Sequence, residues 1–353
     1  MTGPDIRHVL VARLDNAGDV LLTGPAVRAV AAGADRVTYL AGPAGAAAAR
    51  LLPGVDDVWT WESPWTGFDP PAADRADVDA LVDRIAGAGV DSAVVLTSFH
   101  QSPLPLALLL RLAGVSHVAA TSVDYPGSLL DVRHPYLDEV HEVEQSLAVC
   151  AAAGHRLPPG DDGRLRVRLP APTVGLPEVP YIVVHPGASV PARALPVEAT
   201  ADAVARLTTD GWRVVVTGGP AERALVDAVV GGAVPHRIDD RTGATDLADL
   251  AHLLAGAEAV VCGNTGPAHL AAAVGTPVVE AYPPVVPAHR WRPWAVPHVL
   301  LGDQGIACAG CRARSCPVPG QPCLDPFTAE AVVDAVRRLA LRSPAPNRQE
   351  ALR

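Results

Sequence analysis

Short apolar runs alternate with longer amphipathic stretches along most of the chain. The runs have the length of buried strands, and the stretches between them have helical spacing. This alternation predicts an α/β fold, in which parallel sheets are covered by helices on both faces. The predicted strands are residues 8–14, 37–40, 93–97, 115–119, 181–185, 213–217, 259–262 and 277–280.

The helical stretches and one irregular segment divide the chain into two domains. The predicted helices are residues 20–32, 140–153, 197–209, 221–230, 247–255 and 329–341. Residues 156–180 are rich in Pro, Gly and charge and lack a helical period, so we interpret them as a linker. The domains are then residues 1–155 and 181–342, and residues 343–353 are expected to be a disordered tail. The amphipathic helix 329–341 could pack back across the domain junction.

Composition narrows the class of protein. The 353 residues are 49% hydrophobic, which is enough for two cores, and the net charge of −10 argues against nonspecific binding of nucleic acid. Residues 1–160 hold 10 Arg and 19 Asp or Glu, whereas residues 161–353 hold 18 Arg and 19 Asp or Glu. The second half is much less negative than the first, so it is better suited to bind an anion such as a diphosphate.

The sequence contains no segment that we interpret as a leader or a membrane span. Charged residues interrupt the apolar residues near the N-terminus, so no signal peptide is predicted. The uncharged stretches 92–110 and 259–279 contain Pro and polar loop residues, which favours strand–loop–helix units of a soluble fold. We therefore expect a cytoplasmic protein with at most peripheral membrane contact.

The loop after strand 259–262 has the features of an anion site. Its small residues include Asn264, Thr265 and Gly266, and a helix opens near Pro267. Such a loop exposes backbone N–H groups at the positive end of the helix dipole, where a phosphate binds most often. His269 in the first helical turn is either a packed or capping residue, or a group that stabilises or protonates a departing phosphate.

A second anion site is predicted after strand 181–185. The turn that follows can direct the N–H groups of Gly187, Ala188 and Ser189 at one point, and the Ser189 hydroxyl adds a donor. Arg193 adds a guanidinium group, which is permanently charged and can donate two hydrogen bonds to a phosphate. The alternative is an ordinary loop with a solvated arginine.

The loop after strand 213–217 is a third candidate. Gly218 allows close approach of a ligand, and Glu222 lies in the first turn of the next helix. Glu222 either complements the helix dipole or accepts hydrogen bonds from a ribose or sugar hydroxyl.

The first strand ends in a turn with a carboxylate. Asn16, Ala17 and Gly18 form the turn, and Asp19 follows them. Asp19 is either a helix N-cap or a base that takes a proton from a hydroxyl, and Asp15 competes for the second role.

Four cysteines form C-x2-C-x4-C-x6-C near the C-terminus, at Cys308, Cys311, Cys316 and Cys323. This spacing allows one tetrahedral structural zinc, although it matches no metal motif closely. We favour a structural role in which the four cysteines hold this segment together. The thiols are either bound to a metal or free.

Five stretches occur in an order that is typical of one family. They are VLVARLDNAGDVLLTGPAVRAV, VVHPGAS with the following Arg193 and Pro196, DGWRVVVTGGPAE, DLADLAHLLAGAEAVVCGNTGPAHLAAAVGTPVV, and RWRPW. In these stretches, which span nearly the whole chain, the protein resembles glycosyltransferase family 9, the ADP-heptose:lipopolysaccharide heptosyltransferase group. The resemblance implies a GT-B fold, with two Rossmann-like domains facing across a cleft.

The resemblance also implies roles for individual residues. The N-terminal domain would bind the acceptor and the C-terminal domain the nucleotide-sugar, with inversion at the anomeric carbon and no cofactor or metal in catalysis. Asp19 would be the general base, and Asn16 and Gly18 in the same turn would contact the acceptor. Ser189 and Arg193 would contact the diphosphate. Two positions depart from the family. Arg193 lies in Arg-Ala-Leu-Pro where the family has K-x-W-P, and Asn264 replaces the aspartate of N-D-T-G-P.

These observations together predict a glycosyltransferase that moves a sugar, with heptose the leading candidate, from a nucleoside diphosphate, with ADP the leading candidate. The acceptor would be a hydroxyl of a glycan or small molecule. One alternative is a nucleotide-sugar epimerase of the GT-B type. Another is a catalytically weak protein that binds a nucleotide-sugar, because the carboxylate expected at position 264 is missing.

Overall fold

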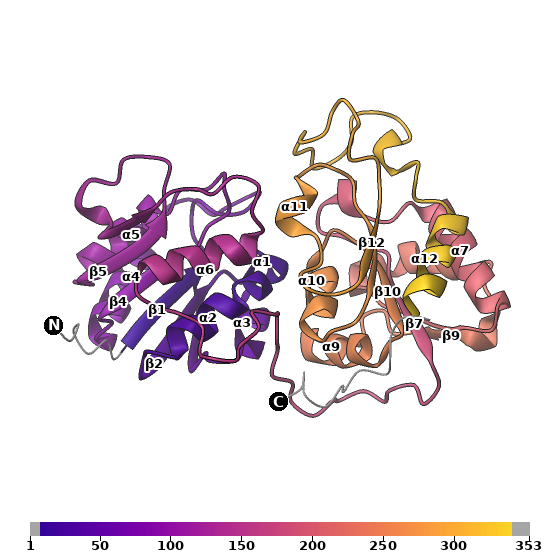
Figure 1. Ribbon diagram of the computed structural model, residues 1–353, viewed down its shortest axis with the longest axis horizontal. Coiled ribbons are helices and arrows are strands. Elements are labelled where there is room, and N and C mark those ends of the chain that lie inside the picture. The colour runs from indigo at the N-terminus through magenta and orange to yellow at the C-terminus, as the bar shows by residue number, and fades with distance from the viewer. Residues whose placement is uncertain (1–7, 341–353) are drawn as a thin grey trace. The chain divides into compact units, whose positions relative to one another are not determined.

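The computed structural model describes residues 8–340 and has two compact units, Met1–Arg166 and Val167–Arg353. Each unit has a six-stranded sheet in which every pair of neighbouring strands is parallel, with helices on both faces (Figure 1). The α/β class expected from the sequence is therefore confirmed.

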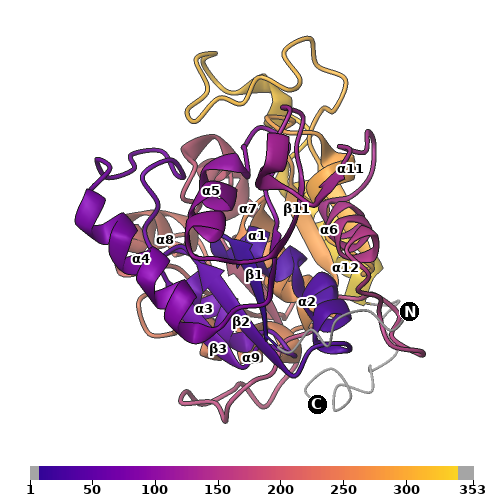
Figure 2. The same cartoon turned by 90° about the vertical axis from the view of Figure 1, so that its left-hand side faces the viewer.

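The sheet of the N-terminal unit has the strand order β3-β2-β1-β4-β5-β6. Its strands are β1 (His8–Arg13), β2 (Arg36–Ala41), β3 (Asp57–Thr60), β4 (Ser92–Val95), β5 (His117–Thr121) and β6 (Val132–His134). Its helices are α1 (Ala17–Leu22), α2 (Gly24–Ala31), α3 (Ala46–Leu51), α4 (Arg75–Ala88), α5 (Leu104–Leu112) and α6 (Glu142–Ala152). Helices α4 and α5 cover one face and enclose a core that includes Leu10, Ile85 and Leu110 (Figure 2).

The sheet of the C-terminal unit has the order β12-β11-β10-β7-β8-β9. Its strands are β7 (Tyr181–His185), β8 (Arg213–Val216), β9 (Ile238–Asp240), β10 (Ala259–Gly263), β11 (Val278–Ala281) and β12 (His298–Leu301). Its helices are α7 (Val197–Thr209), α8 (Arg223–Val230), α9 (Leu247–Gly256), α10 (Gly266–Ala273), α11 (Ala288–Trp291) and α12 (Ala329–Ala340).

The two sheets share one topology. In each, the first strand of the unit pairs with the second on one side and with the fourth on the other, as in a doubly wound dinucleotide-binding fold. The strand order therefore reverses between β1 and β4, and again between β7 and β10. Ligands of such sheets bind outside the carboxyl ends of the strands at this reversal point, so the loops after these four strands are the places to look for a site.

Helix α12 packs within the C-terminal unit. Val332, Val336 and Leu339 belong to the core that α12 shares with α7 and α8, and Arg337 pairs with Asp210 at the end of α7 with an N–O distance of 2.7 Å. The apolar side of α12 therefore packs against the core of its own unit, and packing across the domain junction stays a prediction.

Residues 156–180 contain no helix or strand. The first part of this segment is fastened to the N-terminal unit, because Arg28 Nε donates to Asp161 Oδ2 at 2.6 Å. The later part is fastened to the C-terminal unit, where the Thr173 amide donates to Asp249 Oδ1 at 2.7 Å. The division between the units falls inside this segment, and the tail 343–353 lies outside the described residues.

One helix prediction was wrong in detail. The single helix expected at residues 20–32 is two helices, α1 and α2, which meet at Thr23. Pro25 lies in the first turn of α2 and lacks the N–H group that a continuous helix would use there. The Thr23 hydroxyl instead bonds to the Val20 carbonyl at 2.7 Å.

Candidate functional site

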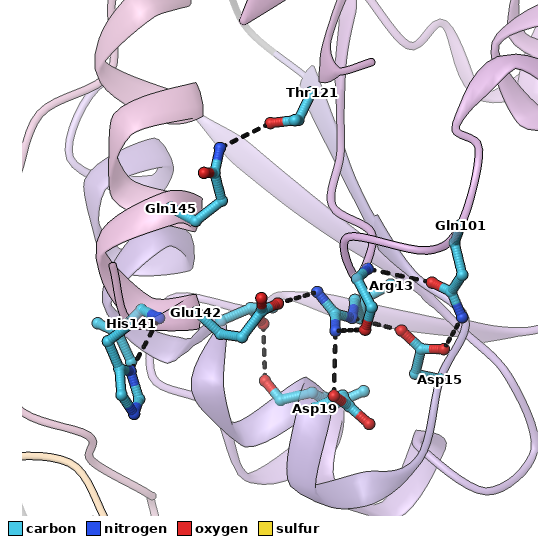
Figure 3. Close-up of polar contacts among 12 residues, drawn as sticks. Arg13, Asp15, Asp19, Gln101, Thr121, His141, Glu142 and Gln145 are labelled. Carbon is cyan, nitrogen blue, oxygen red and sulfur yellow. Dashed lines mark hydrogen bonds and ion pairs between the residues drawn. The ribbon is translucent and has the colours of Figure 1, made fainter. Parts of the chain in front are cut away.

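The loops after β1 and β4 meet around one buried arginine in the N-terminal unit (Figure 3). Arg13 is the last residue of β1 and is 2% exposed. Its guanidinium nitrogens lie 2.6 Å from Asp15 Oδ2, 3.1 Å from Asp19 Oδ1 and 3.5 Å from Glu142 Oε2, and Nη2 donates to Ser98 Oγ at 2.7 Å. One cation therefore holds three carboxylates at the reversal point of the sheet.

Burial and charge act in opposite directions on these groups. Burial alone would lower the pKa of Arg13, but Asp15, Asp19 and Glu142 together raise it above its usual value. Burial raises the pKa of Asp15, while Arg13 and a hydrogen bond from Gln101 act to lower it. Arg13 is thus a permanent cation that compensates buried negative charge.

Asp19 is the most accessible of the three carboxylates. Its side chain is 22% exposed, compared with 9% for Asp15 and 2% for Glu142. It lies in the first turn of α1, whose N-cap is Asn16, so the N-cap alternative for Asp19 was wrong. Of the residues expected to contact an acceptor, Asn16 is exposed and Gly18 is buried. An incoming hydroxyl would reach Asp19 more easily than Asp15.

Sequence reasoning missed Glu142, Ser98 and Gln101. Ser98 follows β4, 85 residues after Arg13, and Glu142 is the first residue of α6, where a carboxylate is ordinarily interpreted as a helix-dipole partner. Glu142 also accepts a hydrogen bond from the Tyr136 hydroxyl at 3.0 Å. No local pattern identifies these residues, because they meet Arg13 only through the folded sheet.

In the C-terminal unit, Glu222 joins the loops after β7 and β8. Its Oε2 accepts a hydrogen bond from the Gly219 amide at 2.6 Å, which is a capping contact. Its carboxylate also occupies the space that a side chain at Gly187 would need, and it lies close to Gly218. Of the remaining predicted contacts on the loop after β7, Ser189 is exposed and Ala188 is half-buried.

Arg193 ends a 3-10 turn, Pro191–Arg193, and lies against the end of β10. Its carbonyl oxygen fills the space where a side chain at Gly263 would lie. Thr265 and Gly266 then begin α10, and both are partly exposed. The loops after β7 and β10, which are far apart in the sequence, are therefore in contact at the reversal point of the second sheet.

Replacing Gly263 with Ala tests this contact. The new Cβ would overlap the Arg193 carbonyl, so the loop carrying Arg193 must shift. We expect a loss of about 1–3 kcal/mol in the free energy of unfolding, as for other overpacked sites. Gly232 is the matched control, because a Cβ there meets only Ala205 at 3.9 Å. Urea denaturation measures both, and equal stability of the two variants would contradict the packing described here.

Several buried polar atoms near this contact have no hydrogen-bond partner. They are Arg193 Nε, His269 Nδ1 and both carboxyl oxygens of Glu280, and the Asn264 side chain beside them interacts with Tyr282. Asn264 is 2% exposed, His269 is 4% exposed and Glu280 is fully buried. Buried polar groups are normally paired, so a concentration of exceptions indicates a place where a ligand or water completes the bonding.

The same groups have shifted acid–base properties. Burial, with a smaller contribution from the Arg193 charge, lowers the pKa of His269 to about 4, so this imidazole is neutral at pH 7. Burial raises the pKa of Glu280 well above its ordinary value, while Arg193 acts to lower it. Perturbed groups of this kind are common in ligand sites.

Glu280 was missed by the sequence analysis. It lies in β11 opposite Cys262 of β10, and it was interpreted only as the end of an apolar strand. An acidic residue inside an otherwise apolar strand was the signal, because a buried carboxylate without a partner is costly.

The four cysteines of 308–323 are not cross-linked. Cys308 and Cys311 are exposed, Cys316 is half-buried and Cys323 is buried. Within residues 8–340, no group of three His, Cys, Asp or Glu side chains is arranged to hold a metal ion. The structural zinc therefore stays a prediction. No helix in the same part of the chain is long and apolar enough to span a bilayer.

Comparison with known proteins points to one family. The model of glycosyltransferase family 9 (heptosyltransferase) matches residues 105–321. None of the curated proteins matches the chain.

Solved structures share the whole fold at low identity. A glycosyl transferase of family 9 from Veillonella parvula is 17% identical with a TM-score of 0.76, covering 96% of this chain and 98% of its own. The ADP-heptose heptosyltransferase II of E. coli is 19% identical with a TM-score of 0.72, covering 95% and 99%. The E. coli heptosyltransferase WaaC with ADP is 20% identical with a TM-score of 0.65, covering 95% and 98%. These likenesses, with the two Rossmann-like sheets, confirm the GT-B fold class.

Proposed function

This chain belongs to glycosyltransferase family 9, and on that premise we propose that it is an inverting, metal-independent transferase that moves heptose from ADP-heptose to an acceptor hydroxyl. The donor would bind to the C-terminal unit, and the acceptor, a glycan or a small molecule, to the N-terminal unit. The protein would act in the cytoplasm with at most peripheral membrane contact.

The observation that carries this proposal is the cluster of unpartnered buried polar atoms at the reversal point of the second sheet. Arg193 Nε is a donor, and the buried Glu280 carboxyl can accept a hydrogen bond and, in its protonated form, donate one. A diphosphate needs donors and a sugar needs both kinds of group, so a nucleotide-sugar matches this combination. Heptosyltransferase WaaC, whose fold is similar, has been solved with ADP.

In the proposed reaction, charge builds on the diphosphate as it leaves. The amides of Gly187, Ala188 and Ser189, the Arg193 guanidinium and the N-terminus of α10 would stabilise that charge. His269 is neutral at pH 7, so it would donate or accept a hydrogen bond and would not supply positive charge. Asn264 would bond to the donor as a neutral amide, where the family has a carboxylate.

Asp19 would accept the proton of the attacking hydroxyl. The new bond joins the acceptor oxygen to the anomeric carbon, on the face opposite the leaving group. The bond from that carbon to the diphosphate breaks, and its electron pair stays on the phosphate oxygen. Arg13 would hold the Asp19 carboxylate in place through its 3.1 Å contact.

A thermal-shift series with ADP, UDP and GDP tests the donor site. A nucleotide that binds the folded protein raises its melting temperature, and ADP is expected to raise it most. Arg193→Ala should remove most of this shift, whereas Arg338→Ala, an exposed arginine on α12, should leave it unchanged. Equal shifts for Arg193→Ala and the unaltered protein would contradict the assignment of Arg193.

Product analysis separates the proposal from its alternatives. Transfer of heptose to an acceptor should persist in EDTA if no metal takes part. Conversion of ADP-heptose without any acceptor, followed by NMR, would instead indicate an epimerase. Binding of ADP-heptose with no turnover under any condition would indicate a nucleotide-sugar-binding protein.

A further inference from the structure

Two adjoining cavities lie at the carboxyl edge of the N-terminal sheet. The first has a volume of about 300 Å³ and lies between the loops after β1 and β4 and the start of α5. The second has a volume of about 190 Å³ and lies between the loops after β1, β2 and β3. Leu14, Thr66 and Gly67 line both cavities, so the two are neighbours. Their combined extent suits a small molecule of one or two rings.

The second cavity is lined by negative charge. Asp15, Glu62 and Asp69 contribute carboxyl groups to it, and no arginine lines either cavity. The chain has no lysine, since its basic residues other than histidine are all arginine. Among the described residues, neither Glu62 nor Asp69 forms an ion pair. Arg13 balances the charge of Asp15, so a phosphorylated ligand would be repelled here by Glu62 and Asp69, which are both exposed.

A buried hydroxyl in the same cavity also lacks a partner. Ser63 lies between Glu62 and Asp69 in the sequence and also lines the second cavity. It is 3% exposed, and its Oγ has no hydrogen-bond partner. An unpartnered buried hydroxyl is an exception that a bound ligand can satisfy. Within residues 8–340 the acidic groups are not arranged to hold a metal ion, so an organic cation is the better match.

The first cavity has a different character. Trp65, Leu96, Pro103 and Leu106 give it apolar walls, and Gln101 adds a polar group where it reaches Asp15. Apolar walls with a few polar groups are suited to the faces of a carbohydrate or cyclitol ring. One end of the ligand site is thus apolar and the other acidic, with Leu14 between them.

We propose that the acceptor is an amine-bearing polyol of small size, such as an amino sugar or aminocyclitol, whose ammonium groups bind Glu62 and Asp69. The ring lies in the first cavity and the ammonium end in the second. This inference rests on the proposed function, because Asp15, which lines the second cavity, shares Arg13 with Asp19, the proposed base. It excludes a phosphorylated glycan as the preferred acceptor.

Calorimetric titration of the full-length protein tests the inference with matched probes. Neamine carries several ammonium groups, and its per-N-acetylated form has the same rings without charge. Trehalose and trehalose 6-phosphate supply a neutral and an anionic comparison. Neamine is expected to bind at least tenfold more tightly than the other three, and added salt should weaken it because the contacts are ionic. Equal or tighter binding of the acetylated or phosphorylated probe would overturn the inference.

Variants then locate the contact. Glu62→Gln and Asp69→Asn should each weaken neamine binding by about twofold to fivefold, as expected for one accessible ion pair. Asp83→Asn, on the exposed side of α4, is the control and should have no effect. Unchanged neamine affinity in both cavity variants would also overturn the inference.

The donor experiments keep this test separate from the proposed function. If ADP still raises the melting temperature and heptose is transferred to a neutral or phosphorylated acceptor, the function stands and the amine-bearing class is wrong. If ADP and ADP-heptose do not bind at all, the proposed function is wrong, whatever the result with neamine.

Discussion

Replacing Asp19 with Ala is expected to lower the rate of heptose transfer by about 10²–10⁴-fold, the range that a general base contributes. The fold should persist, because Arg13 keeps its contacts with Asp15 and Glu142. The shift in melting temperature with ADP should also persist, since Asp19 belongs to the N-terminal unit and the proposed donor groups to the other. Single-turnover measurement with saturating donor isolates the chemical step.

Two further variants make the Asp19 result specific. Asp19→Asn keeps the size of the side chain and a hydrogen-bonding oxygen near Arg13 but cannot accept the proton, so it should be nearly as slow as Asp19→Ala. Asp35→Ala removes an exposed carboxylate of the same unit and should transfer at the unaltered rate. Turnover that survives in Asp19→Ala and disappears in Asp15→Asn would move the base to Asp15.

The sequence predicted the central strands and missed the edges. All eight predicted strands are present, and the four that were missed are β3, β6, β9 and β12, which are the edge strands of the two sheets. Central strands of a parallel sheet are buried on both faces and are therefore continuous apolar runs. The edge strands are short and partly exposed, as in IDD for β9 and VRH for β6, so they carry no such signal.

Some residues of the candidate sites could be predicted from the local sequence, and others depend on contacts between distant parts of the chain. Loops such as Gly187–Ser189 and Thr265–Gly266 were predictable, because small residues after an apolar strand identify the carboxyl edge of a parallel sheet. The partners of Arg13 were not, because Ser98 and Glu142 come from loops and helices far along the chain. The contact between Arg193 and Gly263 likewise depends on β7 and β10 being neighbours.

At position 264 the sequence has Asn where the family has Asp, and the structure shows which acidic group lies nearby. The sequence shows only that a carboxylate is missing from the loop after β10. In the structure, the neighbouring strand β11 carries Glu280, a buried carboxyl within electrostatic range of Arg193. The C-terminal unit therefore has an acidic group near that arginine, on strand β11.

Replacing Arg13 with Met is expected to cost about 3–5 kcal/mol in the free energy of unfolding, because it leaves buried carboxylates without their cation. The loss should exceed that of Arg36→Met, whose partner Asp57 is 42% exposed and whose ion pair is worth at most about 1 kcal/mol. Urea denaturation followed by tryptophan fluorescence measures both variants, and Trp59, Trp61 and Trp65 report on this unit.

The pH dependence and a second substitution identify the cause of the loss. Without Arg13, the pKa of Asp15 should rise further above its unfolded value, so the folded state binds more protons than the unfolded state and stability falls as pH rises. Arg13→Met should therefore be closer to the unaltered protein at pH 5 than at pH 7.5. Adding Glu142→Gln removes one of the uncompensated charges and keeps an acceptor for Tyr136, so it should restore part of the loss. If the double variant is no more stable than Arg13→Met, and the deficit is independent of pH, then Arg13 stabilises the unit by packing its side chain and not by balancing charge.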